Sequence, residues 1–180
     1  LISMPFTRNQ AEAQVQTQAT TLPMNQASVG LAGGCFWCLE SDMDHVTGVV
    51  GTTSGYSGGH LDNPTYKKVS AGGTGHYEVV KIDYDPGQVS FAKILDVFWH
   101  SVDPTDPGGQ FCDRGHSYKT AVFVSTPEER QIAEASKQAL IDQGFNIVTP
   151  ILDVATFYSA EDYHQDYYTK NPRRYNFYRF

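Results

Sequence analysis

The sequence predicts an α+β (mixed α/β) fold: one domain with a central mixed sheet, flanked by helices and connected by long loops. Its 180 residues suit one domain and leave little room for a second independent core. Apolar residues make up 40% of the chain, which is enough to pack that core. Strand-type and helix-type patterns alternate along the chain, but not strictly enough for a purely parallel sheet.

The N-terminal half is predicted as a polar arm followed by three strands and a helix. Residues 1–27 are rich in Gln, Ala and Thr, so we expect a flexible N-terminal arm there and the folded domain over 28–180. In chain order we expect a buried strand over 29–32 that ends at a Gly pair, a helix from Cys35 to about His45, a strand over 49–54, a glycine-rich functional loop over 55–75, and a strand over 76–84. On that last strand, Glu78 shares one face with Val80 and Ile82.

The C-terminal half is predicted from apolar spacing and from capping signals. In chain order we expect a core-facing helix over 90–101, a loop over 103–115 with two Asp-Pro breaks, a strand over 120–125, a helix from 126 to about 144, a strand over 146–152, and a last helix that stops before Pro172. Capping residues at 126–129 and 159–162 mark the starts of the last two helices. Residues 164–167 continue the last helix in this prediction and receive no chemical role.

Charge and cysteine content exclude several classes of protein. Thirteen Lys and Arg against 20 Asp and Glu give a net charge of −7, which argues against nucleic acid as a partner because phosphate binding needs clustered cations. No stretch approaches the roughly 18–20 apolar residues that span a bilayer. We therefore expect no membrane association and a cytoplasmic location, or a periplasmic or exported one if a signal preceded Leu1. Nothing indicates an obligate interface, so we expect a monomer.

Cys35 and Cys38 form a Cys-x-x-Cys at the expected strand-to-helix turn. A thiol at a helix start lies near backbone N–H groups and the positive end of the helix dipole, which lower its pKa. Cys35 is therefore a candidate thiolate nucleophile. Cys38 lies one helical turn further on the same side and could close a disulfide once Cys35 is oxidised. The simpler interpretation is a pair of small buried side chains, as free cysteines often are.

Two other interpretations of the cysteines remain open at this point. A structural zinc site would use three thiols and one imidazole, from Cys35, Cys38, Cys112 and His116. The bulky Phe-Trp insert of the first pair speaks against it. A general thioredoxin-like dithiol oxidoreductase would place Pro150 opposite the cysteines, but the chain between Cys38 and Pro150 is long and poor in strands for that fold.

Several motifs together resemble those of the A-type peptide-methionine (S)-S-oxide reductases, the methionine sulfoxide reductase A family. In family order they are Gly34-Cys35-Phe36-Trp37 followed by Glu40, then 53–59, 64–66, 75–80, 103–105 and 110–115. They cover about residues 28–168, and matches at several separated blocks in order are implausible by chance. The resemblance implies a ferredoxin-like sandwich core. It also implies reduction of the S-diastereomer of methionine sulfoxide, free or in proteins, as repair during oxidative stress.

The resemblance also implies roles for individual residues. Cys35 would attack the substrate sulfur and become a sulfenic acid, while Glu78 would protonate the leaving oxygen. A carboxyl held near aromatic rings and away from water has a raised pKa, which suits that role. Tyr66 and Tyr118 would hydrogen-bond the sulfoxide oxygen, and Asp113 would order the hydrogen bonds of the site.

The implied substrate pocket and reductant complete this expectation. Phe36 and Trp37 would hold the S-methyl group, since sulfur contacts with aromatic rings are favourable. The implied reaction uses no metal, flavin or nucleotide cofactor. An external reductant such as thioredoxin or glutaredoxin would restore the enzyme.

One feature departs from the pattern of many family members, which carry recycling cysteines near the C-terminus. This chain has no cysteine after Cys112. The thiol that resolves the sulfenic acid is therefore open among three candidates. In order of preference these are Cys38, an external thiol and Cys112.

Overall fold

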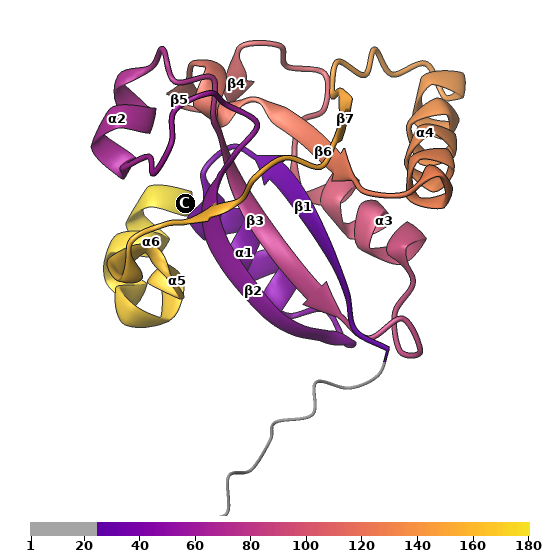
Figure 1. The fold of residues 1–180 in the computed structure, drawn as a ribbon, viewed down its shortest axis with the longest axis horizontal. Helices are drawn as coiled ribbons and strands as arrows, with labels where there is room; N and C mark the ends of the chain where they lie inside the picture. Colours follow the sequence, from indigo (N-terminus) through magenta and orange to yellow (C-terminus); the bar gives the residue numbers. More distant parts are fainter. Residues whose placement is uncertain (1–24) are drawn as a thin grey trace, which may run out of the picture.

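The computed structural model describes residues 25–180, which fold around one six-stranded sheet (Figure 1). Across the sheet the strand order is β7-β6-β1-β3-β2-β8. The strands are β1 (Ala27–Gly33), β2 (Val49–Ser57), β3 (Tyr77–Tyr84), β6 (Thr120–Val124), β7 (Ile151–Asp153) and β8 (Tyr158–Ser159). A separate hairpin is formed by β4 (Gly109–Gln110) and β5 (Asp113–Arg114).

The central four strands and two helices form a ferredoxin-like sandwich. In chain order these elements are β1, α1 (Phe36–Asp44), β2, β3, α3 (Phe91–Ser101) and β6. The strands β6, β1, β3 and β2 are neighbours in that order, and each pair is antiparallel. Only the outer strand β7 runs parallel to its neighbour β6, so the sheet is mixed. The predicted α+β domain with a mixed sheet is confirmed.

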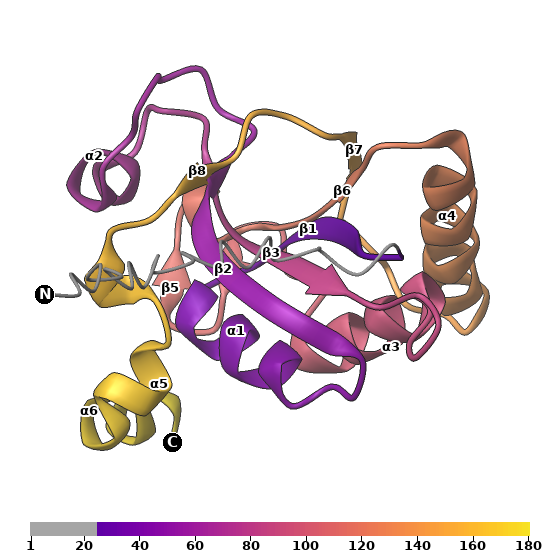
Figure 2. The same cartoon turned by 60° about the horizontal axis from the view of Figure 1, so that its bottom comes forward.

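The main hydrophobic core lies between this sheet and the helices α1 and α3, which cover one face side by side (Figure 2). Side chains alternate between the two faces of a strand. On β3 this alternation turns Glu78, Val80 and Ile82 toward the helices, and all three are buried as predicted. A carboxyl group is thus built into the strand that faces α1.

Within residues 25–180, the other face of the sheet packs fewer apolar side chains than the face under the helices. A small cluster lies there, formed by Ala32, Val79, Ala121 and Phe123 with Phe157 packed against it. The long helix α4 (Pro127–Asp142) packs instead against α3, β6 and the edge strand β7. Its predicted cap is confirmed, because the side chain of Thr126 accepts the N–H of Glu129.

Two predicted loops contain secondary structure. The segment predicted as a loop over 55–75 holds the end of β2 and the short helix α2 (Tyr66–Ala71). The segment over 103–115 contains the β4–β5 hairpin. The strand predicted over 146–152 is shorter than expected, since only β7 pairs with β6. The predicted arm over 1–27 lies outside the described residues up to position 24, and Ala27 already pairs in β1.

The last predicted helix is wrong. Residues after β8 form a 3₁₀ turn over Asp162–His164, and Asp166 then adopts a left-handed φ of 51°, which interrupts any helix. Two short helices follow, α5 (Tyr167–Lys170) and α6 (Pro172–Arg179). Pro172 begins α6 instead of ending a helix, because a proline at the first helical position loses no hydrogen bond.

Among residues 25–180, no helix has the length and apolar character needed to cross a membrane.

Candidate active site

The turn that carries the cysteines depends on a glycine after β1. Gly34 has a left-handed φ of +83°, and a Cβ at this position would lie 2.6 Å from the Cβ of Gln110. Cys35 follows as the N-cap of α1, and its carbonyl oxygen accepts the backbone N–H of Cys38 at 3.3 Å. The predicted placement of the Cys-x-x-Cys at a strand-to-helix turn is confirmed.

Glu78 lies on β3 next to the first turn of α1. Its side chain is 2% exposed, and its Oε1 accepts the backbone N–H of Phe36 at 3.2 Å. Its Oε2 has no hydrogen-bond partner within residues 25–180. Burial raises the pKa of Glu78 to about 8 and the charge of Asp113 adds to this rise, while the Phe36 N–H and the Tyr118 hydroxyl oppose it. Glu78 is therefore protonated near neutral pH, in agreement with the raised pKa expected for it.

The two thiols differ in the direction of their pKa shifts, and this corrects one expectation. The pKa of Cys35 is raised well above its usual value by its hydrogen bond with Cys38, by burial and by Glu78. The N–H of Trp37 opposes this rise but does not overcome it. The pKa of Cys38 is lowered by the Cys35 thiol and by Arg179, against the opposing effect of burial. The prediction that the helix start gives Cys35 a lowered pKa is thus wrong for the resting protein. There, Cys38 loses its proton first and Cys35 keeps one.

Tyr66 and Tyr118 come from separate elements and meet beside Glu78. Tyr66 is the first residue of α2, and Tyr118 ends a 3₁₀ turn over His116–Tyr118. Burial, followed by the charge of Glu78, raises the pKa of both phenols. Both therefore remain neutral hydrogen-bond donors near a protonated carboxyl.

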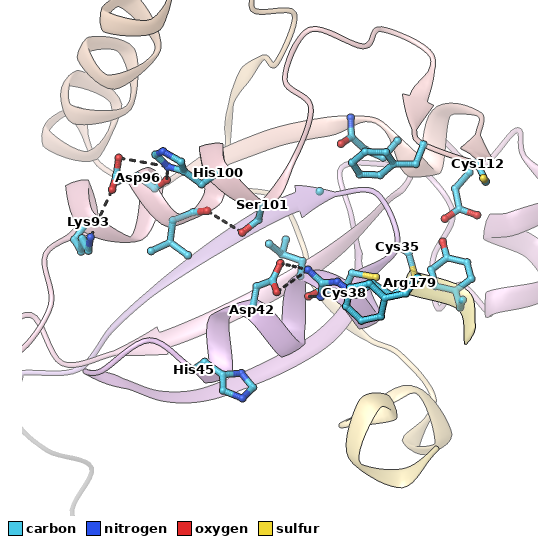
Figure 3. A pocket seen from close by; sticks show the side chains of 18 residues that line it. Cys35, Cys38, Asp42, His45, Lys93, Asp96, His100, Ser101, Cys112 and Arg179 are labelled. Carbon is cyan, nitrogen blue, oxygen red and sulfur yellow. Dashed lines mark hydrogen bonds and ion pairs between the residues drawn. The ribbon is translucent and has the colours of Figure 1, made fainter. Parts of the chain in front are cut away.

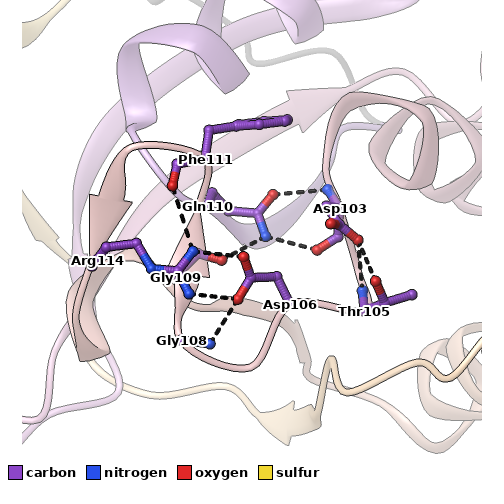
Figure 4. A network of polar contacts seen from close by, with 8 residues as sticks. All are labelled: Asp103, Thr105, Asp106, Gly108, Gly109, Gln110, Phe111 and Arg114. Carbon is purple, nitrogen blue, oxygen red and sulfur yellow. Dashed lines mark hydrogen bonds and ion pairs between the residues drawn. The ribbon is translucent and has the colours of Figure 1, made fainter.

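The loop that carries Asp113 is held together by its own polar contacts (Figure 4). The Gln110 side chain accepts the N–H of Asp103 at 2.8 Å and donates to its carbonyl at 2.7 Å. Arg114 pairs with Asp106 through both guanidinium nitrogens, at 2.6 and 2.8 Å. Asp113 pairs with Gln110 in the hairpin and is half-buried, and burial raises its pKa. Its predicted role in ordering the site remains a prediction.

Phe36 and Trp37 lie among aromatic side chains from the C-terminal segment. Phe36 is buried, and its ring centroid lies 5.9 Å from that of Tyr56 and 5.1 Å from that of His164. The half-buried Trp37 stacks on Tyr167 with centroids 3.8 Å apart and planes at 8°. Its indole Nε1 donates to Nδ1 of His164 at 3.0 Å. These contacts fix the orientation of the indole ring, and the role of the two residues as a substrate pocket remains a prediction.

Sequence patterns did not reveal the roles of Glu161, His164 and Tyr167, because their segment was predicted to be a helix. Glu161 accepts the hydroxyl of Tyr56 at 3.0 Å and the backbone N–H of Tyr66 at 3.2 Å. His164 is buried, and burial lowers its pKa. Because its Nδ1 accepts from Trp37, the neutral ring carries its proton on Nε2, which has no partner in the described part of the chain. The high density of aromatic and polar residues over 158–168, which include Tyr167, is the sequence feature that could have indicated a role in the site.

Three carboxyl groups gather at the side of α1 away from the cysteines: Glu40, Asp44 and Asp166, whose oxygens lie within 4.8 Å of one another. Burial raises the pKa of Glu40 to about 7. Its carboxyl accepts the backbone N–H of Asp166 and the hydroxyl of Ser54. The cluster therefore joins α1 to the C-terminal segment and holds the left-handed turn at Asp166.

A groove of about 950 Å³ opens beside the two thiols (Figure 3). Its lining includes Cys35, Cys38, Phe111, Cys112, Tyr178 and Arg179. These residues come from the start of α1, the β4–β5 hairpin and the end of α6. Glu78 and Tyr66 do not line the groove. The thiols can therefore be reached from the groove without passing the buried carboxyl.

The two alternative interpretations receive no support from this geometry. Cys35, Cys38, Cys112 and His116 form no group of metal ligands within the described range. The Nε2 of His116 instead hydrogen-bonds the carbonyl of Gly75 at 2.9 Å. Pro150 joins the sheet edge, where its carbonyl accepts the N–H of Val122, and it does not line the groove.

Comparison with known proteins identifies the family. The family model described as peptide methionine sulfoxide reductase matches residues 27–180. The chain belongs to the peptide methionine sulfoxide reductase family. It is an enzyme of the MsrA type, which reduces methionine sulfoxide. The expected family and activity are thereby confirmed.

Individual relatives of this peptide methionine sulfoxide reductase agree. Peptide methionine sulfoxide reductase MsrA of Limosilactobacillus reuteri is 50% identical over 148 residues, which cover 80% of this chain and 85% of the relative. The crystal structure of Mxr1 from Saccharomyces cerevisiae in reduced form is 31% identical, with a TM-score of 0.78 over 84% of this chain and 88% of that one. A structure of Mxr1 in complex with Trx2 is 20% identical over 84% of this chain and 91% of that one. Its TM-score of 0.56 shows a likeness of fold.

Proposed function

We propose that this enzyme reduces the S-diastereomer of methionine sulfoxide, free or in oxidised proteins, through a sulfenic acid on Cys35. The observation that carries the proposal is the buried carboxyl of Glu78, which accepts the N–H of the residue after Cys35 and has a pKa of about 8. Its Oε2 has no hydrogen-bond partner among residues 25–180. A neutral carboxylic acid away from water is the group that sulfoxide reduction needs to protonate the leaving oxygen. Repair of oxidised proteins is the cellular role that this activity serves.

In the first step, Cys35 attacks the sulfoxide sulfur and a Cys–S to substrate-S bond forms. Glu78 donates its proton to the oxygen, and the proton of the Cys35 thiol replaces it on the carboxyl. The oxygen then transfers to Cys35 and methionine leaves, so that a thiol and a sulfoxide become a sulfenic acid and a thioether. Tyr66 and Tyr118 donate hydrogen bonds to the oxygen as negative charge develops on it.

Three fixed positions around the sulfur account for selection of one diastereomer. The methyl group lies against Phe36 and Trp37, the oxygen lies toward Glu78, and the sulfur faces Cys35. Exchange of the oxygen and the lone pair would turn the oxygen away from its acid. An arrangement of this kind favours one hand of sulfoxide, and the resemblance of the sequence motifs supports the S form.

In the second step, Cys38 attacks the Cys35 sulfur and forms a disulfide with loss of water. An external dithiol of the thioredoxin or glutaredoxin type then reduces the disulfide. Two observations support Cys38 for this role. It lines the same groove as Cys35, and its pKa is lowered. The open groove gives a protein reductant access to the pair.

The test is a dithiothreitol-driven assay on separated S and R diastereomers of a blocked methionine sulfoxide. We expect consumption of the S form alone. Glu78→Gln should lose that activity, whereas Glu134→Gln, which changes an exposed carboxyl of α4, should retain it. Consumption of R alone, of both forms equally, or of neither by the folded protein would contradict the proposal.

A further inference from the structure

We propose that Arg179, the last residue of α6, is a positioning residue for Cys38, and that it prepares this thiol for disulfide formation with oxidised Cys35. The inference rests on the proposed function, in which Cys38 is the resolving thiol. It assigns to the C-terminal helix a role in the second step of the reaction, although the helix carries no cysteine.

The Arg179 side chain crosses from α6 to the first two turns of α1 (Figure 3). Its Nη2 contacts both carboxylate oxygens of Asp42, at 2.9 and 3.1 Å. Its Nη1 donates to the carbonyl of Cys38 at 3.5 Å and to the hydroxyl of Tyr175. The guanidinium is thus held from three directions, at the residue whose thiol lines the same groove.

Contacts with Asp42 and Tyr175 hold Arg179 in its position. Its side chain is 29% exposed and that of Asp42 is 23% exposed, so the pair is largely shielded from water. Tyr175, one helical turn earlier on α6, is buried, and the guanidinium lies 5.9 Å from the centre of its ring. A shielded cation acts on a neighbouring thiol more strongly than a solvated one.

Four groups on three parts of the molecule act on the pKa of Cys38. The Cys35 thiol and Arg179 of α6 favour the thiolate, whereas Asp42 of α1 and Asp113 of β5 disfavour it. Tyr178 and His45 line the same groove. Once Cys35 is a sulfenic acid, its thiol no longer donates to Cys38. Arg179 is then the remaining one of these groups that favours the thiolate.

Arg179 acts on the step that forms the disulfide between Cys38 and oxidised Cys35. The Cys38 thiolate attacks the Cys35 sulfur, the S–S bond forms, and the S–O bond breaks. The oxygen leaves as hydroxide and takes a proton from water or from Glu78, so that the products are a disulfide and water. The sulfur of Cys35 is reduced and that of Cys38 is oxidised, and no other reactant is needed.

The experiment compares four variants, with Arg179→Lys as the fourth, in a Cys112→Ser background that leaves only the two thiols of the turn. Arg179→Gln removes the cation, Asp42→Asn removes its counter-charge, and Arg174→Gln removes an exposed cation on the same helix as a matched control. Each protein receives one equivalent of methionine sulfoxide between pH 5.5 and pH 9. Rapid quenching and mass spectrometry then separate methionine formation from conversion of the sulfenic acid to the disulfide.

We expect opposite shifts in the pH profile of disulfide formation. Arg179→Gln should move the midpoint to higher pH and slow the step below it by about threefold for each unit of pKa, since a rise in nucleophilicity offsets part of the lost thiolate. Asp42→Asn should move the midpoint to lower pH, and Arg174→Gln should leave it unchanged. Arg179→Lys, which keeps the charge, should restore part of the rate.

This pattern separates an electrostatic role from a structural one. Both Arg179→Gln and Asp42→Asn break the same ion pair, so a purely structural role shifts both variants in the same direction. Any result other than opposite shifts overturns the inference. A failure of the proposed function would give a different result, because the Cys112→Ser parent protein itself would then form no methionine.

Discussion

The two thiols of the first turn of α1, three residues apart, lie in different surroundings. Cys35 lies next to the buried carboxyl of Glu78, and its pKa is raised by Cys38, by burial and by Glu78. Cys38 lies next to the cation of Arg179, and its pKa is lowered by the Cys35 thiol and by Arg179. Both thiols line the same groove, so they differ in proton affinity and not in access.

This difference teaches that a helix N-terminus does not by itself decide which thiol ionises. The N–H of Trp37 favours the Cys35 thiolate, but the Cys38 thiol and burial outweigh it. At Cys38 the Cys35 thiol and then Arg179 lower the pKa against the opposing effect of burial. The same turn can thus supply one thiol for a proton-coupled attack and another for disulfide formation.

The largest expected effect comes from removing the Cys35 thiol, which lies next to the Glu78 carboxyl. Cys35→Ser should lower methionine formation by at least about 10³-fold, because a serine hydroxyl is a far weaker nucleophile without a dedicated base. Cys112→Ser, at the exposed tip of the hairpin, is the control and should retain formation of the first methionine. Single-turnover assays measure both. Substantial turnover by Cys35→Ser would exclude it as the nucleophile.

Removal of the acid should have the next largest effect. Glu78→Gln should slow methionine formation by about 10²- to 10⁴-fold, the usual contribution of a general acid. In the parent protein the rate of this step should fall as the pH rises through about 8, where Glu78 loses its proton. The residual rate of the variant should lack this fall. A parent rate that stays level between pH 7 and pH 9.5 would refute the assignment.

Glu78→Gln should also raise the free energy of unfolding, because it removes an ionisable group from the buried surroundings of Cys35. Between the usual pKa of a glutamate and about 8, the folded protein binds one more proton than the unfolded chain, so its stability falls as the pH rises. This loss is at most about 1.4 kcal/mol for each pH unit, and Glu78→Gln removes it. Chemical denaturation at pH 8 should therefore show a more stable variant, while the two proteins converge toward pH 4.5. Equal free energies of unfolding at pH 8 would mean that burial does not raise the pKa of Glu78.

A smaller effect is expected where the C-terminal segment supports the pocket. Tyr167→Ala removes the ring stacked on Trp37, a contact of about 0.5–1.5 kcal/mol. We expect KM for the sulfoxide to rise by a few-fold, up to about tenfold, with little change in kcat. Phe177→Ala, which removes a ring that is 91% exposed on α6, is the control. A larger effect on kcat than on KM would show that Trp37 acts in the chemical step.

Local sequence patterns predicted the half of the fold in which short-range rules dominate. The alternation on β3 placed Glu78 with the core, and the glycines before Cys35 marked the strand-to-helix turn. The C-terminal segment could not be predicted in this way, because long-range contacts determine its structure. The carboxyl of Glu40 accepts the backbone N–H of Asp166 and so stabilises the left-handed turn that interrupts the predicted helix.

The same limit applies to the site. The motifs named Cys35 and Glu78, whose chemistry is local to α1 and β3. The contribution of Arg179 depends on α6 folding back onto α1, and a proline that begins a helix was interpreted as one that ends it. His164 was missed for a similar reason, since its contacts with Trp37 span 127 residues of sequence.

The most direct test of the division between the two thiols is a count of products from Cys38→Ser. Mixed with excess S-sulfoxide and no external thiol, this variant should form one methionine per chain as fast as the parent protein does. It should then stop with a sulfenic acid on Cys35 that dimedone traps. Loss of that first methionine, or a chain that holds no trappable sulfenic acid after forming it, would contradict the account.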